Sequence, residues 1–123
     1  MQTDATARRD LFRSSTHILI LAILTDGPAH GYAIQRELKR TLSQSLSDSS
    51  LYPLLNKLET QGHIAATPTT HNGRPRKVYH LTAQGQQHLR KSTAHWQATI
   101  AQLQSVILPA VRRVATKTNS QAD

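Results

Sequence analysis

Two groups of polar and basic side chains stand close together in the middle of the chain. The first group combines hydroxyl, amide and amine functions: Ser49, Ser50, Tyr52, Asn56 and Lys57. The second is purely basic: Arg74, Arg76 and Lys77. Hydroxyl and amide groups suit the edges of nucleobases, whereas guanidinium and ammonium groups suit phosphates. Together they predict an interface for double-stranded DNA.

A helix is expected to carry the first group, because four leucines before Gly62 recur at the spacing i, i+3, i+4 and i+7: Leu51, Leu54, Leu55 and Leu58. The polar group then occupies the opposite face, and Glu59 falls on its flank. Pro53 is tolerated only in a first turn, so the helix should begin near Ser49 or Ser50, under serine caps. Gly62 suits a left-handed C-cap. An ordinary solvated helix face is the alternative for these side chains.

A hairpin is expected to carry the second group. Ile64–Pro68 and Val78–Leu81 are short runs with β-branched and aromatic residues, and Asn72-Gly73 between them favours a tight turn. The basic cluster, stiffened by Pro75, then lies at the tip of the hairpin. Contact with DNA phosphates or the minor groove would use these charges, and a merely solvated loop is the alternative.

Two helices are expected before this region. Ile18–Thr25 is apolar and follows a polar arm, with Ser14 to Thr16 as N-cap candidates and the Gly27-Pro28 break after it. A second helix is amphipathic, with basic residues outside and these apolar positions inside: Ala33, Ile34, Leu38 and Leu42. The sequence therefore predicts a mainly α fold with a small β-hairpin.

The C-terminal region predicts a dimer. Apolar residues alternate at spacings of four and three, with Leu89 seven residues before the first: Trp96, Ile100, Leu103, Ile107, Ala110 and Val114. A thin domain buries such a seam poorly by itself, so a second subunit is its natural partner and a homodimer is expected. Packing on its own domain is the alternative. Pro109 should kink this helix.

Composition narrows the class of protein. The chain has 123 residues, a formal charge of +8 and no cysteine, and residues 60–122 contain no acid. One compact domain with an appendage fits this length, and a polyanionic partner fits this charge. There is no phosphate-cradling glycine loop, no thiol and no metal-ligand spacing among the seven histidines, so we expect no catalytic residue, no metal and no cofactor. No apolar run is long enough to cross a bilayer, and we expect a cytoplasmic protein.

These motifs, in order, resemble the PadR family of transcriptional regulators. The matching segments are Asp26-Gly27-Pro28-Ala29-His30-Gly31-Tyr32-Ala33-Ile34, Ser50-Leu51-Tyr52-Pro53, Leu58-Glu59, Gly62, Gly73-Arg74-Pro75-Arg76-Lys77, Tyr79 and Leu81-Thr82-Ala83-Gln84-Gly85. His63 departs from the apolar residue that is more usual after the glycine.

The resemblance implies a winged helix-turn-helix that binds a palindromic operator as a homodimer and represses transcription until an effector releases it. It also implies that Trp96, with Ile100, Leu103 and Ile107, lines a subunit interface where a planar aromatic or cationic small molecule could stack. An architectural or protein-binding winged-helix module without effector control is the alternative.

By position, residues 1–81 would form the DNA-binding domain with its N-terminal arm, residues 82–117 the dimerisation helix, and residues 118–123 a disordered tail.

Overall fold

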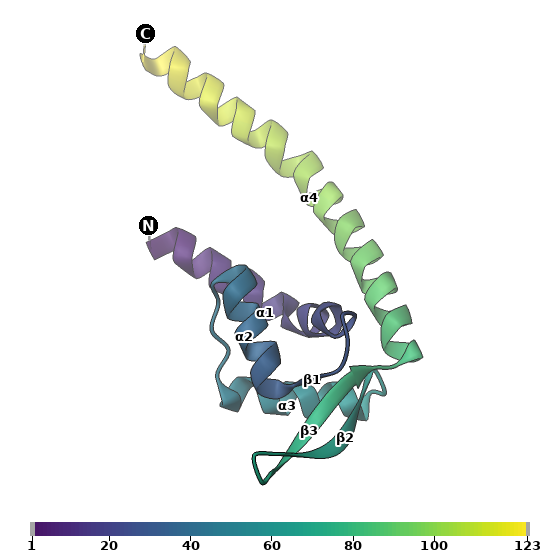
Figure 1. Cartoon of the computed structure of the whole chain (residues 1–123). Coiled ribbons are helices and arrows are strands. Elements are labelled where there is room, and N and C mark those ends of the chain that lie inside the picture. The colour runs from purple at the N-terminus through teal and green to yellow at the C-terminus, as the bar shows by residue number, and fades with distance from the viewer. Residues whose placement is uncertain (1, 123) are drawn as a thin grey trace. The chain divides into compact units, whose positions relative to one another are not determined.

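A computed structural model describes the backbone of residues 2–122 and the side chains of residues 5–117. The described chain runs in this order: α1 (Gln2–Leu24), β1 (Ala29–His30), α2 (Gly31–Leu42), α3 (Asp48–Thr60), β2 (Ile64–His71), β3 (Arg74–Leu81) and α4 (Ala83–Ala122) (Figure 1). It is a winged helix-turn-helix with a C-terminal helix, as the sequence predicts. The chain forms two compact units, residues 1–90 and 91–123.

The core of the first unit is built from the inner faces of the three N-terminal helices, closed by the sheet. Its fully buried side chains are Ile20, Leu21, Ile34, Leu38, Leu51, Leu55, Leu58 and Ile64. Leu54 is half-buried and packs against this cluster. The leucine stripe predicted for α3 is therefore confirmed, and it leaves the opposite face of that helix to the solvent.

Helix α1 is longer than the sequence predicts. The polar arm before Ile18 is helical, and Phe12 anchors it in the core with 7 % of its surface exposed. Ser14 Oγ donates to the Leu11 carbonyl at 2.9 Å, and Thr16 Oγ1 donates to the Phe12 carbonyl at 2.7 Å. The expected N-caps are thus wrong: both hydroxyls bond back to the preceding turn inside a continuous helix.

Helix α3 begins at Asp48 and follows Ser47, which has extended dihedral angles. The Ser47 hydroxyl bonds to the Ser49 and Ser50 hydroxyls at 3.0 and 3.1 Å, so none of the serines caps a backbone N–H in the way the sequence suggested. Pro53 is the sixth residue of α3 and lies in its second turn, not in the first turn as expected, because the helix begins earlier than Ser49.

The other end of α3 is the predicted left-handed cap. Gly62 has a φ of +81°. Its N–H donates to the Glu59 carbonyl and the His63 N–H donates to the Leu58 carbonyl, both at 3.0 Å. These two bonds form a Schellman motif, which turns the chain sharply from the helix into β2.

The sheet has the order β1-β3-β2, with all pairs antiparallel. The β2–β3 hairpin, here called the wing, pairs from Ile64 with Leu81 out to His71 with Arg74. Asn72 and Gly73 both have positive φ, as a two-residue type I′ turn requires. The strands are longer than predicted, so the basic cluster lies on β3 itself and not on a loop. The short β1 was not predicted.

Helix α4 starts under a threonine cap. The Gly85 N–H donates to Thr82 Oγ1 at 3.0 Å, and the same hydroxyl donates to the Gly62 carbonyl at 2.6 Å. Leu89 packs against the core, and the first compact unit runs to Arg90.

The helix continues through Pro109 to Ala122 without interruption. The backbone of the tail expected from residue 118 is therefore helical as far as Ala122, and the tail's side chains lie outside the described residues.

Candidate nucleic-acid interface

The polar face of α3 is open to solvent. Ser49, Ser50, Asn56 and Lys57 are exposed, and Tyr52 exposes 36 % of its surface. Because the leucine stripe holds the other side of the helix in the core, this face is free to meet a partner. Glu59 is half-buried and belongs to neither face.

Tyr52 does not project freely from the helix. A Cβ atom on Gly31 would lie 2.8 Å from the Tyr52 hydroxyl oxygen, so the tyrosine ring packs over the first residue of α2. The absence of a side chain at Gly31 therefore sets the orientation of Tyr52, which the sequence places on the recognition face. Burial raises the pKa of the nearby Tyr79 phenol, and Tyr52 and Glu59 raise it further.

One pocket of about 470 Å³ joins α3 to the wing. Tyr52 and Asn56 line it from the helix, and Arg76 and Lys77 line it from β3. Four of the eight predicted DNA-binding residues are therefore brought to a single concave surface. Its amide, phenol and cationic groups could bind both base edges and phosphates.

The other four predicted residues lie away from this pocket. Ser50 lines a separate hollow beside α1. Lys57 is close enough to His17 of α1 for its charge to contribute to lowering the pKa of that imidazole. Ser49 is held by its bond to Ser47, and Arg74 is exposed at the end of the wing.

Two residues of α2 join the interface without having been selected from the sequence. Tyr32 lines the same pocket, and the Arg36 guanidinium carbon lies 5.4 Å from the centroid of its ring. The Arg76 guanidinium carbon lies 6.0 Å from the same centroid. The spacing of Tyr32 and Arg36, four residues apart on one helix, was the available signal. No sequence signal indicated the contact between Arg76 of the wing and Tyr32.

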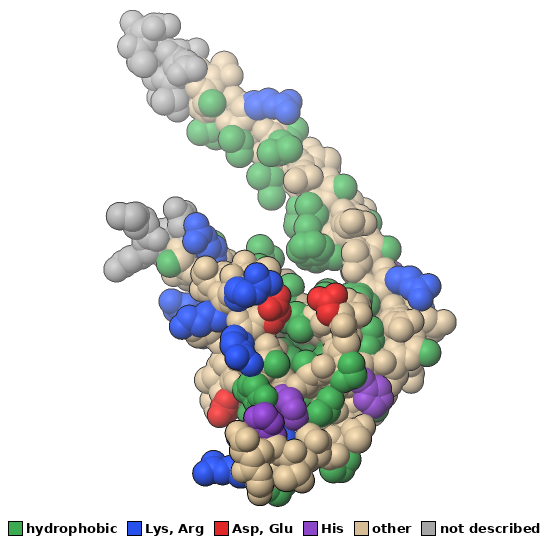
Figure 2. All heavy atoms as spheres, viewed as in Figure 1, with side chains coloured by type: hydrophobic (Ala, Val, Ile, Leu, Met, Phe, Trp, Pro, Cys, Tyr) green, Lys and Arg blue, Asp and Glu red, His purple; other side chains and the backbone are tan. Residues whose placement is uncertain are grey.

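The charge on this unit is mostly unopposed. Among the described residues the ion pair is Arg40 with Glu37, at 2.5 Å. Neither the wing bases nor Arg36 has a carboxylate partner in the described part of the chain. On the face shown in Figure 2, Lys and Arg side chains gather over α1 and α2. This distribution favours an anionic partner.

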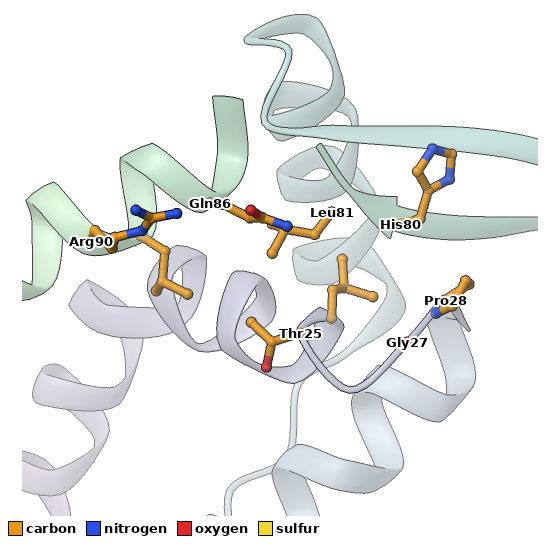
Figure 3. A pocket seen from close by; sticks show the side chains of 9 residues that line it. Thr25, Gly27, Pro28, His80, Leu81, Gln86 and Arg90 are labelled. Carbon is orange, nitrogen blue, oxygen red and sulfur yellow. The ribbon is translucent and has the colours of Figure 1, made fainter. Parts of the chain in front are cut away.

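A further hollow of about 390 Å³ lies at the base of α4, within the same unit (Figure 3). Gln86 and Arg90 line it from α4, and Thr25, Gly27 and Pro28 line it from the turn after α1. It contains none of the predicted DNA-binding residues, so it is separate from the interface on α3 and the wing.

The second unit carries the apolar residues predicted for a subunit interface. Trp96, Leu103 and Ile107 expose 46 %, 54 % and 51 % of their surfaces, and Ile100 is half-buried. Val106, Leu108, Val111 and Val114 are also exposed. Figure 2 shows apolar side chains along α4. Such a face on one chain is typical of a surface that another protein covers.

Within the described residues, no three His, Cys, Asp or Glu side chains are grouped so that they could hold a metal ion. No described helix is long and apolar enough to span a membrane.

Comparison with known proteins agrees with this architecture. The chain is 32 % identical over 77 residues to a transcriptional regulator of Mycobacterium tuberculosis, which covers 63 % of this chain and 71 % of the relative. A PadR family transcriptional regulator from Eggerthella lenta superposes with a TM-score of 0.79 and 28 % identity, covering 86 % of this chain and 93 % of its own. A protein of Streptococcus mutans superposes with a TM-score of 0.63 and 36 % identity, covering 74 % and 84 %.

The pattern of the family described as "Transcriptional regulator PadR-like family" matches residues 20–91. This match spans the end of α1, β1, α2, α3, the wing and the start of α4, and so includes the elements that build the interface, α2, α3 and the wing. Members of this family are regulators of transcription and not enzymes. The chain belongs to the PadR-like family of transcriptional regulators.

Proposed function

We propose that the protein is a sequence-specific DNA-binding repressor that acts as a homodimer on a palindromic operator. The observation that carries this proposal is the pocket in which Tyr52 and Asn56 of α3 meet Arg76 and Lys77 of the wing. Neutral hydrogen-bonding groups beside two cations suit a base edge next to a phosphate. Such a regulator would work in the cytoplasm, where it reaches the chromosome.

In this proposal α3 of each subunit enters a major groove and the wing touches the flanking backbone. Two subunits related by a two-fold axis would place their helices about one helical turn of DNA apart. Tyr52, Asn56, Ser49 and Ser50 would bias the choice of sequence. Lys57, with the basic cluster of β3, would supply affinity through phosphates.

The subunit contact would be made by the apolar face of α4. A lone helix that exposes Trp96, Leu103 and Ile107 has no partner within its own unit that removes them from water. Burying them against a second copy removes that apolar surface from water, which stabilises the dimer by about 25 cal/mol for each Å² buried. The spacing of four and three residues fits a two-helix seam.

Control by an effector is part of the same proposal. Trp96 exposes 46 % of its surface and offers an indole face on which a planar aromatic or cationic molecule could stack. A ligand bound between subunits would favour a spacing of the two recognition helices that fits the operator poorly. Only a difference in affinity between the two arrangements can drive this shift.

Selection of bound fragments from a random duplex pool tests the regulator proposal. A regulator should enrich a two-fold symmetric motif, with half-sites about one helical turn apart. The selected duplex should then bind at least about 1,000-fold more tightly than a scrambled duplex in the same salt. An architectural module would bind both duplexes equally, and that result would refute sequence-specific regulation.

Tryptophan fluorescence tests the effector site, because Trp96 is the single tryptophan of the chain. A compound that weakens operator binding should change the emission of Trp96 over the same concentration range. A Trp96→Phe variant, which keeps an aromatic ring, controls for loss of packing. An inducer that leaves Trp96 emission unchanged places the effector elsewhere.

A further inference from the structure

Tyr32 separates two hollows on the surface of the first unit. One is the pocket shared by α3 and the wing, of about 470 Å³. The other, of about 480 Å³, lies along α2 and is lined by Tyr32 together with Gln35, Arg36, Lys39, Arg40, Ser45 and Leu46. The tyrosine therefore joins a basic surface on α2 to the basic surface of the wing.

Two guanidinium groups from different elements converge on this ring. The Cζ atom of Arg36 lies 5.4 Å from the ring centroid and the Cζ atom of Arg76 lies 6.0 Å from it. Their separation is therefore no greater than the sum of these two distances. Arg36 reaches the ring from the next turn of α2, whereas Arg76 reaches it from β3.

This arrangement places two like charges against one aromatic ring. Among the described residues neither arginine forms an ion pair, and both are exposed. The other groups on Tyr32 are the rings of His30, stacked at 5.2 Å, and His71, at 6.2 Å. A cation over an exposed aromatic ring contributes only about 0.5–1 kcal/mol. An anion placed between the guanidiniums would relieve their mutual repulsion.

We infer that Arg36 and Arg76, held on Tyr32, clamp a backbone phosphate of the bound DNA. This inference rests on the proposed function and adds α2 to the DNA-binding surface. Planar guanidinium forks match the oxygens of a phosphate, and they do so best when their orientation is set in advance. Tyr32 is the positioning residue, because it touches both arginines and supplies no charge of its own.

The position of the clamp determines what it does. Tyr32 shares its pocket with Tyr52 and Asn56, so a phosphate held there lies beside the groove that α3 would read. A phosphate contact carries no sequence information. The clamp therefore sets the orientation of the protein on the duplex and adds equally to the affinity for every sequence.

The variant Arg36→Ala tests the clamp in the full-length protein. We expect its affinity for the selected operator and for a scrambled duplex to fall by the same factor. The slope of log affinity against log salt should become shallower by about 0.9. Between about 50 and 200 mM salt the wild type should then lose about 3.5-fold more affinity than the variant.

Arg90→Ala is the matched control, since it removes the same charge from the same compact unit but lines the separate hollow at the base of α4. Its salt slope should stay at the wild-type value. An Arg36→Ala slope equal to that of Arg90→Ala would overturn the clamp. Loss of operator binding alone would also overturn it, because that outcome indicates a base contact.

Two substitutions at Tyr32 separate positioning from folding. Tyr32→Phe keeps the ring, so its salt slope should match that of the wild type. Tyr32→Leu removes the ring and should reproduce the Arg36→Ala slope, with no further change when the two substitutions are combined. Thermal melting identifies any general loss of stability. Additive effects of Tyr32→Leu and Arg36→Ala would contradict positioning.

A phosphate group could also come from a small anion. Titration calorimetry with inorganic phosphate at constant ionic strength distinguishes this source, and the DNA clamp predicts no saturable binding. Saturable binding that Arg36→Ala abolishes would assign the site to a free anion instead.

Failure of the proposed function has a different signature. In one outcome the wild type binds operator and scrambled duplexes equally while Arg36→Ala still has the shallower salt slope. That result would refute sequence-specific regulation and support the phosphate clamp. An unchanged slope together with an intact sequence preference would refute only the clamp.

Discussion

The imidazole rings of His63 and His88 stack face to face, with centroids 4.1 Å apart and planes inclined by 12°. The His17 ring lies 6.4 Å from that of His88. Burial is the main cause that lowers the pKa of His63, and the neighbouring His88 and His17 lower it further. Burial likewise lowers the pKa of His17, with smaller contributions from His88 and Lys57. Every named neighbour is a base, so protonation of His17 or His63 disfavours the fold.

Stability should therefore fall on mild acidification. In the unfolded chain His17 and His63 titrate near pH 6.5, whereas in the folded chain their pKa values are lower. Between the folded-state pKa and about 6.5 the unfolded chain holds more protons, so the free energy of unfolding decreases as the pH falls. The slope is at most about 1.4 kcal/mol per pH unit for each imidazole. Urea denaturation at pH 7.5, 6.5 and 5.5 measures it.

The His63→Leu variant tests the origin of this dependence, because it places an apolar side chain in the same turn. It should flatten the pH profile, whereas His95→Asn on the exposed part of α4 should leave the profile as in the wild type. A wild-type stability that stays constant from pH 7.5 to 5.5 would contradict the prediction.

The joint between the Gly62 turn and α4 tolerates no side chain at Gly85. A Cβ atom there would overlap the His63 carbonyl oxygen and lie 2.8 Å from Cδ1 of Leu81. Gly85→Ala should therefore lower the free energy of unfolding by at least about 2 kcal/mol, although alanine is the better helix former. Gln87→Ala, at an exposed position of the same helix, should change it by less than about 0.5 kcal/mol. Equal melting curves for the two variants would refute the close packing.

The Thr82 hydroxyl should contribute to the stability of the same joint. It accepts from the Gly85 N–H and donates to the Gly62 carbonyl, so Thr82→Val loses two hydrogen bonds at constant shape. We expect a loss of about 1–2 kcal/mol in denaturant titrations. Thr82→Ser, which keeps the hydroxyl, should recover most of it. If serine proves no better than valine, the cap does not contribute.

Two substitutions on α3 should separate the contribution to sequence specificity from the contribution to affinity. Asn56→Ala should reduce operator affinity by about 1–3 kcal/mol and relax the preference at one base pair, with little effect on a scrambled duplex. Lys57→Ala should weaken both duplexes alike and flatten the salt dependence. Competition binding against a panel of single-base operator variants measures both. An Asn56→Ala variant with an unaltered base preference would remove Asn56 from the reading face.

The apolar face of α4 should control assembly. Leu103→Glu places a charge in the proposed seam and should raise the dimer dissociation constant at least about 100-fold. Gln104→Glu adds the same charge at the next exposed residue, and it should leave the dimer intact. Light scattering across a dilution series reports the molecular mass. A Leu103→Glu protein that remains dimeric down to the same protein concentration as the wild type would place the subunit contact elsewhere.

Local patterns in the sequence predicted those parts of the structure that depend on neighbours in the chain. The leucines of α3 lie on one face because helical spacing puts them there. Gly62 adopts positive φ, and Asn72-Gly73 forms the turn, because few other residues accept those dihedral angles. The extent of α1 was missed, since its polar first half is helical partly through the burial of Phe12, which is a tertiary contact.

The sequence by itself determined the class of the protein, the composition of the reading face and the sign of its charge, because periodicity and charge are properties of residue order. Only the tertiary structure decided which of those charges meet. Arg36 and Arg76 are far apart in the sequence and converge on Tyr32, and His17, His63 and His88 come together from three separate segments. Contacts of this kind arise from how helices and strands pack, and no local spacing encodes them.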